Sequence, residues 1–145
     1  MNKTDNQRLV LTLVLSVLAY LCAGTVSTLV SVYLPVIVNE LVKGNATDQD
    51  LGSYGAYVNA VFLYGWMVGG ILLGMLSDRF GRKKVLAFSV ALYGIATLSI
   101  VIAADWYLLM GLRFLAGIGV GGTLVLSTVM ISEIWPEKSR SIVQG

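Results

Sequence analysis

Four long apolar runs, separated by short connections, constrain this chain more than any other feature of its sequence. The runs cover residues 9–38, 53–76, 85–104 and 107–131. About twenty helical residues, at about 1.5 Å each, cross the roughly 30 Å hydrocarbon core of a bilayer, so every run is long enough to span it. Backbone amides in lipid must be bonded within their own segment, and helices meet that condition. The sequence therefore predicts an all-α membrane protein with four transmembrane helices, antiparallel from one to the next because the connections are short.

The composition agrees with the lipid bilayer as the main partner. Of the 145 residues, 57% are hydrophobic and 12% are charged, about half the charge of a typical soluble domain. The net charge is +2 and no basic face is present, which argues against a nucleic-acid partner. There is no histidine, and the single cysteine, Cys22, lies in an apolar run. We therefore expect no disulfide, no metal site and no cofactor. No segment gathers an acid–base pair with a nucleophile, so we do not expect an enzyme.

The first run is longer than the others. It exceeds the length of a cleavable signal peptide and of an upright membrane helix. We expect it to be retained, and to tilt, to bend near Gly24 or Pro35, or to extend beyond the membrane.

Lysine and arginine are distributed unequally between the two sides. Two of these basic residues precede the first run, four lie in residues 77–84, and two follow the fourth run. Because the helices alternate in direction, these eight lie on the same side of the membrane. Of the other two, Lys43 lies in the first connection and Arg113 lies within a run. The positive-inside rule places the side with more positive charge in the cytoplasm. We expect a plasma (inner) membrane protein with a cytoplasmic N-terminus.

The connection at residues 77–84 has features that membrane topology does not explain. Its basic residues hold a loop inside the cell, but this role explains neither Asp78 nor the two glycines. The pattern is Gly74-x-x-x-Asp78-Arg79-x-Gly81-Arg82-Lys83-Lys84. It closely resembles the signature loop between the second and third helices of the major facilitator superfamily.

Two further segments are similar to the same family. Residues 113–122 read Arg113-Phe-Leu-Ala-Gly117-Ile-Gly119-Val-Gly121-Gly122 and look like its fourth-helix motif, especially in the sugar and organic-ion porters. Glu133, Pro136 and Arg140 resemble the pattern where the fourth helix leaves the membrane. The fourth-helix segment also satisfies G-x-G-x-x-G, but a nucleotide-binding turn follows a strand, and this one lies inside an apolar run.

The resemblance implies a fold and a function. The chain looks like four helices of the six-helix N-terminal half of a twelve-helix transporter, residues 1–145 being a partial half whose partners are the missing C-terminal helices. Such a transporter moves a small polar solute, a sugar or an organic ion, by alternating access. In the family, the acid and arginines of the loop form contacts that hold the outward-open state. Seven residues match this gating network: Gly74, Asp78, Arg79, Gly81, Arg82, Glu133 and Arg140. Gly74 would let helices approach closely, and Gly81 would permit a tight turn.

Arg113 is the one charged residue well inside a span. It either snorkels outward, bonds backbone carbonyls, pairs with an anionic substrate group, or pairs with a proton-carrying acid. The first run contains no acid, which weakens the case for proton-coupled symport through this half and leaves a facilitator, an anion porter, or a coupling acid elsewhere. Gly117 and Gly121 share the face of Arg113 and leave room for a helix or a substrate.

The other candidates for binding or coupling are polar or aromatic residues within the spans. Asn59 and Trp66 lie roughly on one face of the second run. Thr28 belongs to a stripe in the first run that suits either a cavity wall or hydrogen bonding between helices. The stripe comprises Ser16, Tyr20, Gly24, Thr28 and Ser31, with Pro35 after it. The pairs Gly65/Gly69 and Gly70/Gly74 suggest a packing seam.

Two alternatives to a transporter segment stay open from the sequence. One is a small four-helix membrane protein that works as an oligomer, and the other is a truncated remnant that does not transport.

Overall fold

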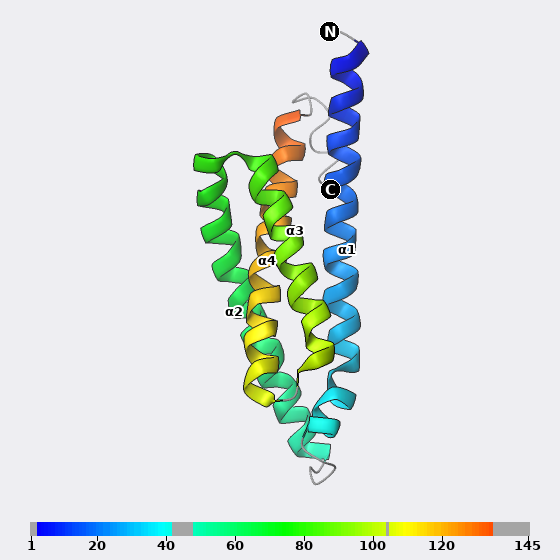
Figure 1. Ribbon diagram of the computed structural model, residues 1–145, viewed down its shortest axis with the longest axis vertical. Helices are drawn as coiled ribbons and strands as arrows, with labels where there is room; N and C mark the ends of the chain where they lie inside the picture. Colours follow the sequence, from blue (N-terminus) through cyan, green and yellow to red (C-terminus); the bar gives the residue numbers. More distant parts are fainter. Residues whose placement is uncertain (1–2, 42–47, 104, 135–145) are drawn as a thin grey trace.

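The structure, a computed structural model, describes residues 3–41, 48–103 and 105–134. Its elements are α1 (Lys3–Leu41), α2 (Asp48–Phe80), α3 (Arg82–Ser99), the 3-10 turn η1 (Ile100–Ile102) and α4 (Trp106–Ile134) (Figure 1). Within these helices four stretches are long and apolar enough to cross a membrane: Val14–Asn39, Gly52–Phe80, Arg82–Ile102 and Trp106–Ser132. The predicted all-α membrane fold with four spanning helices is confirmed.

The connection expected at residues 77–84 is not a loop. α2 continues to Phe80, α3 starts at Arg82, and Gly81 alone interrupts them. Gly81 has a φ of +91°, a value that residues with a side chain rarely adopt. Its N–H still donates to the carbonyl of Ser77 at 2.9 Å. Asp78 and Arg79 therefore continue the helix, and Gly81 alone makes the turn.

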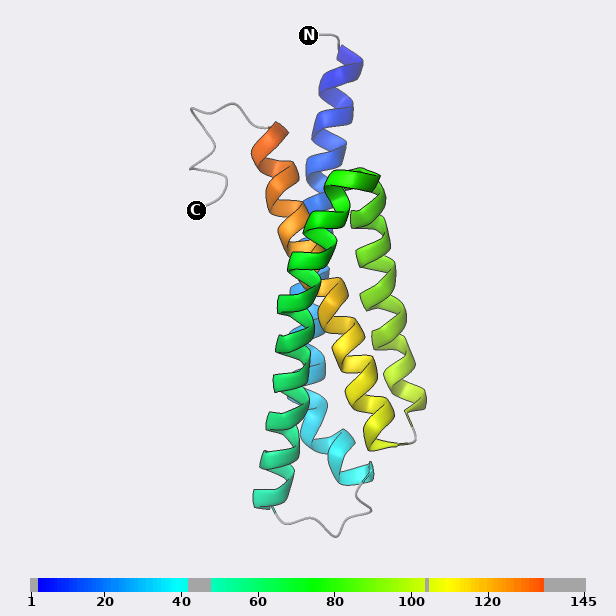
Figure 2. The same ribbon diagram turned by 90° about the vertical axis from the view of Figure 1, so that its left-hand side faces the viewer.

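The first helix is continuous from Lys3 to Leu41 and contains Pro35. Of the three outcomes expected for its length, a bend and an extension are seen. Its N-terminal turns project beyond the other helices, and its last turns bend away from the preceding ones (Figures 1 and 2). Proline has no N–H, so the carbonyl of Ser31 loses its usual helical donor, which is a common cause of such a bend.

α4 is the central helix of the bundle. It packs against all three other helices, most extensively against α2 and then α3, whereas α1 contacts α2 and α3 little. Accordingly, 56% of the apolar membrane-spanning stretch of α4 is buried within the bundle, against 17% of that of α1. Consecutive helices run antiparallel, so α2 and α4 run in the same direction (Figure 2). The start of α1, the α2–α3 junction and the end of α4 therefore lie at one end of the bundle.

Four glycines bring α2 and α4 together, and we call them the glycine seam: Gly65 and Gly69 of α2, and Gly117 and Gly121 of α4. A Cβ at any of them would collide with backbone atoms of the facing helix. The expected seam at Gly65/Gly69 is confirmed, and the face beside Arg113 accommodates a helix. Close approach at Gly74 is not present, because a Cβ there would lie 3.6 Å from Cγ1 of Val125, an ordinary contact.

Candidate functional site

Arg113 is buried in the middle of the bundle. It lies on α4, and its residue exposure is 1%, which makes it the largest fully buried side chain among the described residues. Its guanidinium carbon lies 5.4 Å from the centre of the Phe62 ring of α2. The guanidinium does not reach the outer surface, so the structure does not show the snorkelling that the sequence left open.

Two of the three guanidinium nitrogens of Arg113 have no hydrogen-bond partner among the described residues. Its Nε and Nη2 atoms are both buried and unbonded. Among the side chains that the structure describes, the one ion pair joins Asp78 to Arg82, at the α2–α3 junction and away from Arg113. Burying an unpaired charge costs several kcal/mol, and a desolvated cation–π contact returns only about 2 kcal/mol. The fold therefore holds a guanidinium whose hydrogen-bonding capacity is largely unused.

Asn59 lies on α2, about one helical turn before Phe62. It precedes Phe62 by three residues on α2, so the two share a face. The Ser31 hydroxyl of α1 is 3.2 Å from Asn59 Oδ1 and 2.9 Å from the carbonyl oxygen of Ser27. One hydroxyl proton cannot serve both acceptors fully. The pair ties α1 to α2 within one helical turn of the ring that contacts Arg113.

Trp66 lies near the Phe62 ring, whereas Thr28 lies on the exposed side of α1. The Trp66 ring lies 6.3 Å from the Phe62 ring and is 37% exposed. Thr28 is exposed on α1, and its hydroxyl donates to the carbonyl of Gly24 at 2.9 Å. The structure therefore places Arg113 and Trp66 beside Phe62. Asn59 lies one helical turn away on α2, and Thr28 is exposed on α1.

The polar stripe of α1 does not form one inward face. Ser16 is buried and Ser31 bonds α2, but Tyr20 and Thr28 are exposed. Sequence reasoning missed Phe62, because a phenylalanine in an apolar run carries no signal of its own. Its position three residues after Asn59 and four before Trp66 was the one available indication.

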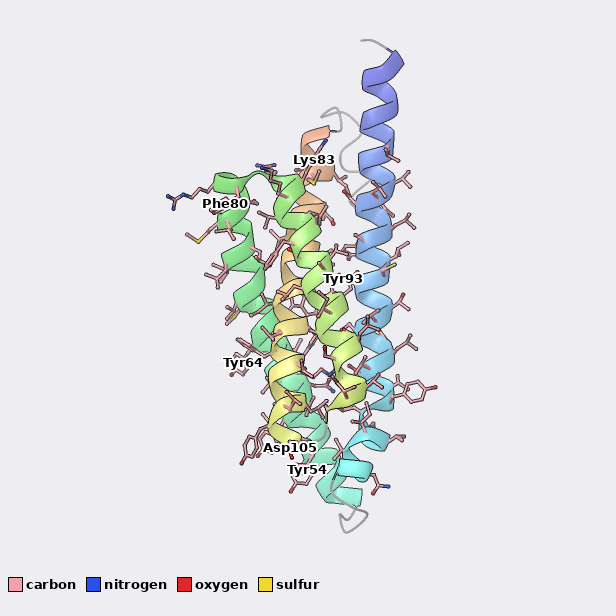
Figure 3. The ribbon with its side chains drawn as sticks, in the orientation of Figure 1. Tyr54, Tyr64, Phe80, Lys83, Tyr93 and Asp105 are labelled. Atoms are coloured by element: carbon pink, nitrogen blue, oxygen red, sulfur yellow. The ribbon has the colours of Figure 1, made fainter. Side chains whose placement is uncertain are left out.

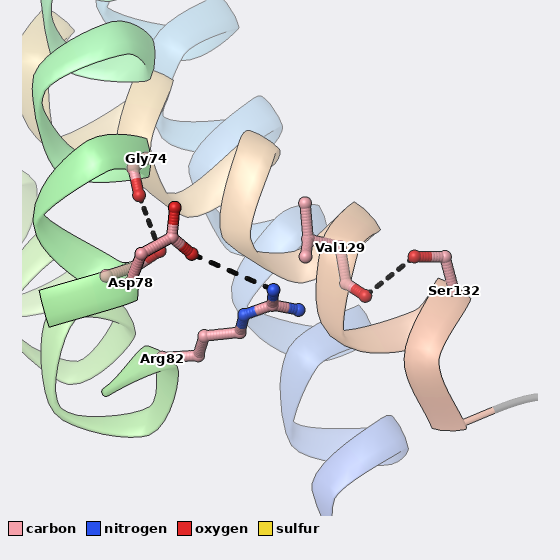
Figure 4. Close-up of polar contacts among 6 residues, drawn as sticks. Gly74, Asp78, Arg82, Val129 and Ser132 are labelled. Atoms are coloured by element: carbon pink, nitrogen blue, oxygen red, sulfur yellow. Dashed lines mark hydrogen bonds and ion pairs between the residues drawn. The ribbon is translucent and has the colours of Figure 1, made fainter.

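The gating candidates lie at the end of the bundle where α2 meets α3. Asp78 Oδ1 is 3.8 Å from Arg82 Nη2, so this ion pair bridges the break at Gly81 (Figure 4). The Asp78 side chain is 73% exposed and that of Arg82 is 29% exposed. Arg79 is exposed, and the Gly74 carbonyl accepts a 2.6 Å hydrogen bond from Ser77 Oγ.

Two members of the expected gating network cannot be placed. The side chain of Glu133 and all of Arg140 lie outside the described residues. The structure therefore brings Asp78 and Arg82 together, and the rest of the network stays a prediction.

Comparison with known proteins agrees with the resemblance of the motifs. A profile of the Major Facilitator Superfamily matches residues 16–145. The 4-hydroxybenzoate transporter PcaK of Pseudomonas aeruginosa is 36% identical in an alignment that covers 68% of this chain and 22% of that protein. Human organic anion transporter 3 is 36% identical over 58% of this chain and 16% of its own length. The low-affinity glucose transporter HXT3 of Saccharomyces cerevisiae is 38% identical over 56% of this chain and 14% of its own length.

These matches cover about a fifth or less of the length of each relative. No solved structure matches the chain.

Proposed function

Because this chain belongs to the major facilitator superfamily, we propose that it is the N-terminal part of a longer secondary transporter that moves a small polar solute by alternating access. Its relatives are named as transporters rather than enzymes, and its four apolar helices make it an integral membrane protein. We further propose the plasma (inner) membrane and a cytoplasmic N-terminus. The clustering of basic residues at the end of the bundle that holds the start of α1 and the α2–α3 junction supports this orientation.

We propose that the solute is an organic anion bound through Arg113. The observation that carries this proposal is the pair of unbonded atoms, Nε and Nη2. These two nitrogens lie on the same edge of the guanidinium, so a carboxylate can accept a hydrogen bond from each. Such a ligand would also neutralise the buried charge. Among the relatives, the names 4-hydroxybenzoate and organic anion agree with an anionic solute, whereas glucose does not.

The neighbours of Arg113 supply further selectivity in this proposal. The Phe62 ring offers an apolar surface beside the cation, and the Trp66 ring lies 6.3 Å from the Phe62 ring. The Asn59 amide offers donors and an acceptor. A planar carboxylate with an aromatic or polar body would use all three kinds of contact. The site would therefore distinguish an organic acid from an inorganic anion.

The test is binding and uptake of radiolabelled 4-hydroxybenzoate by the full-length protein in proteoliposomes. Removing one partner of a buried charged contact costs about 2–5 kcal/mol, so we expect Arg113→Gln to weaken binding by about 30-fold or more. Lys84→Gln removes one exposed positive charge and serves as the matched control. If the parent binds 4-hydroxybenzoate and folded Arg113→Gln binds it equally well, the proposal that the anion binds through Arg113 is wrong. No binding of 4-hydroxybenzoate or of other carboxylates by the parent would remove it as well.

We also propose that the Asp78–Arg82 pair takes part in gating. In this conformation Asp78 is mostly exposed, so the pair contributes about 1 kcal/mol at most. A gate needs interactions whose total free energy differs by a few kcal/mol between the two states. The remaining part would come from Arg79, Glu133 and Arg140 in a state where more of these charges meet.

The gating proposal is tested by spin labels on the two sides of the full-length protein. We expect Asp78→Asn to change the populations of the two inter-label distances measured by pulsed electron resonance. Populations and transport rates equal to those of the parent would show that Asp78 has no gating role.

A further inference from the structure

Two glycines of the seam, Gly65 of α2 and Gly117 of α4, lie where the two main chains touch. A Cβ on Gly117 would collide with the carbonyl oxygen of Phe62 and would lie 3.2 Å from the carbonyl carbon of Gly65. A Cβ on Gly65 would collide with the carbonyl oxygen of Phe114 and would lie 3.1 Å from its carbonyl carbon. At this level each helix therefore rests a main-chain carbonyl on a glycine of the other helix.

These two contacts fix the main chain of both partners in the cation–π pair. The carbonyl that lies on Gly117 belongs to Phe62 itself. The carbonyl that lies on Gly65 belongs to Phe114, the residue after Arg113. Phe62 is 5% exposed and Arg113 is 1% exposed, so the described helices enclose both side chains. No side-chain rotation changes the spacing of the two main chains that carry the ring and the guanidinium.

The Phe62 ring restricts the Arg113 side chain without using its hydrogen-bond donors. The guanidinium carbon lies over the ring, 5.4 Å from its centre, within the range of a cation–π contact. Nε and Nη2 stay unbonded among the described residues. Arginine has several rotatable bonds, and a ligand that must order such a side chain binds more weakly. The ring therefore holds two free donors in a defined position before a ligand arrives.

We propose that Gly117 is a positioning residue of the anion site at Arg113. Because it has no side chain, the main chain of Phe62 reaches α4, and the ring is held against the guanidinium. Gly117 itself need not touch the solute. This inference rests on the proposed function of Arg113, and it adds the residue that orders the guanidinium for a carboxylate. Alanine at position 117 would push Phe62 away from α4 and leave the arginine less ordered.

The chain offers two matched controls. A Cβ on Gly69 would also collide with main-chain atoms of α4, those of Ile118, but Gly69 lies seven residues after Phe62, about 10 Å along α2. Gly69→Ala should therefore weaken the same interface without disturbing the pair. Tyr64, two residues after Phe62, is exposed and points away from the other helices (Figure 3). Tyr64→Leu thus removes an aromatic ring of α2 that does not contact the guanidinium.

The first experiment measures the ring–guanidinium contact without any solute. 4-Fluorophenylalanine is incorporated at position 62 of the full-length protein, and its fluorine resonance is recorded in detergent. Arg113→Met should shift this resonance, because the cation beside the ring is lost. Gly117→Ala should shift it toward the value of Arg113→Met, whereas Gly69→Ala should leave it near that of the parent. Equal shifts in the two alanine variants, or no shift in Arg113→Met, would overturn the proposal.

The second experiment measures binding of 4-hydroxybenzoate by the full-length protein. We expect Gly117→Ala to weaken binding by about 2- to 13-fold, the range for ordering one long side chain. Gly69→Ala, with a similar loss of melting temperature, should bind as the parent does. Phe62→Leu should weaken binding to the same extent as Gly117→Ala, and Tyr64→Leu should not. In the Phe62→Leu background Gly117→Ala should have no further effect, because both act through the ring.

The outcomes separate this inference from the function on which it rests. Equal affinities of Gly117→Ala and Gly69→Ala, or additive effects of Gly117→Ala and Phe62→Leu, would show that Gly117 acts on stability alone. If Gly117→Ala does not fold, Gly65→Ala makes the equivalent clash from α2 and takes its place. A fluorine resonance that responds as expected, in a parent that binds no carboxylate, would support the positioning of Arg113 and refute the anion function.

Discussion

Replacing Gly69 of the glycine seam with alanine tests one of the closest contacts between the described helices. An added Cβ would lie 2.6 Å from the carbonyl carbon of Ile118 and nearer still to its oxygen and Cα. Ordinary Cβ contacts begin at 3.4 Å. All three atoms belong to the main chain, so no side-chain rotation relieves the clash. α2 and α4 must separate by about 1 Å, a gap that removes a quarter to a half of the attraction between the facing atoms.

The expected loss of stability follows from two opposing contributions. Overpacking an interior site costs about 1–3 kcal/mol, and the separation weakens the most extensive interface of the bundle. Alanine returns about 0.5–1 kcal/mol through its better helix propensity. We expect Gly69→Ala to be less stable by about 2 kcal/mol, which lowers the melting temperature by about 4–8 °C for a chain of this size.

Thermal unfolding in detergent, followed by circular dichroism, measures this loss against two controls. Gly94→Ala on α3 meets nothing within 4 Å, and Gly70→Ala meets a flexible methyl group of Val125 at 3.3 Å. The melting temperatures should fall in the order Gly94→Ala, Gly70→Ala, Gly69→Ala. If Gly69→Ala melts together with Gly94→Ala, the two helices do not approach as described and the reasoning fails.

Three other substitutions test separate parts of the structure. Arg113→Met should raise stability without ligand by about 2–3 kcal/mol, because it removes an unpaired charge from within a membrane helix, and it should abolish anion binding. A lower melting temperature would show that the charge is compensated. Gly81→Ala should cost about 1–2 kcal/mol through backbone strain alone, since a Cβ there meets no atom within 4 Å; calorimetry beside Gly94→Ala checks this. Asp78→Asn should change the melting temperature by less than about 4 °C at low salt, and a larger fall would indicate contacts beyond the exposed pair with Arg82.

The sequence was sufficient for the number and type of the helices, because long apolar runs in lipid have few alternatives. It was not sufficient for the α2–α3 connection, where charges suggested a loop although Asp78 and Arg79 continue the helix and only Gly81 breaks it. Membrane boundaries and helix boundaries are set by different physics, the first by solvation and the second by backbone geometry.

The candidate site was predictable in part. Arg113 stood out because a charge in a span is rare, and its burial agrees with that signal. Its contact with Phe62 depends on how α2 and α4 align, which the glycine seam determines across two distant segments. The exposure of Thr28 has a similar origin: a stripe of polar residues defines a face of α1 but does not say which way that face turns. Such facts arise from tertiary packing and leave no local trace.

The glycine seam also limits which second substitutions can compensate for a substitution in the seam. Where one side chain crowds another, a smaller residue across the interface restores the fit. At the four seam glycines a new methyl group would meet main-chain atoms, and no substitution makes a main chain smaller. A genetic selection for second-site suppressors of Gly69→Ala should therefore recover reversion to glycine or changes that relax a distant interface, and no compensating residue opposite the lesion.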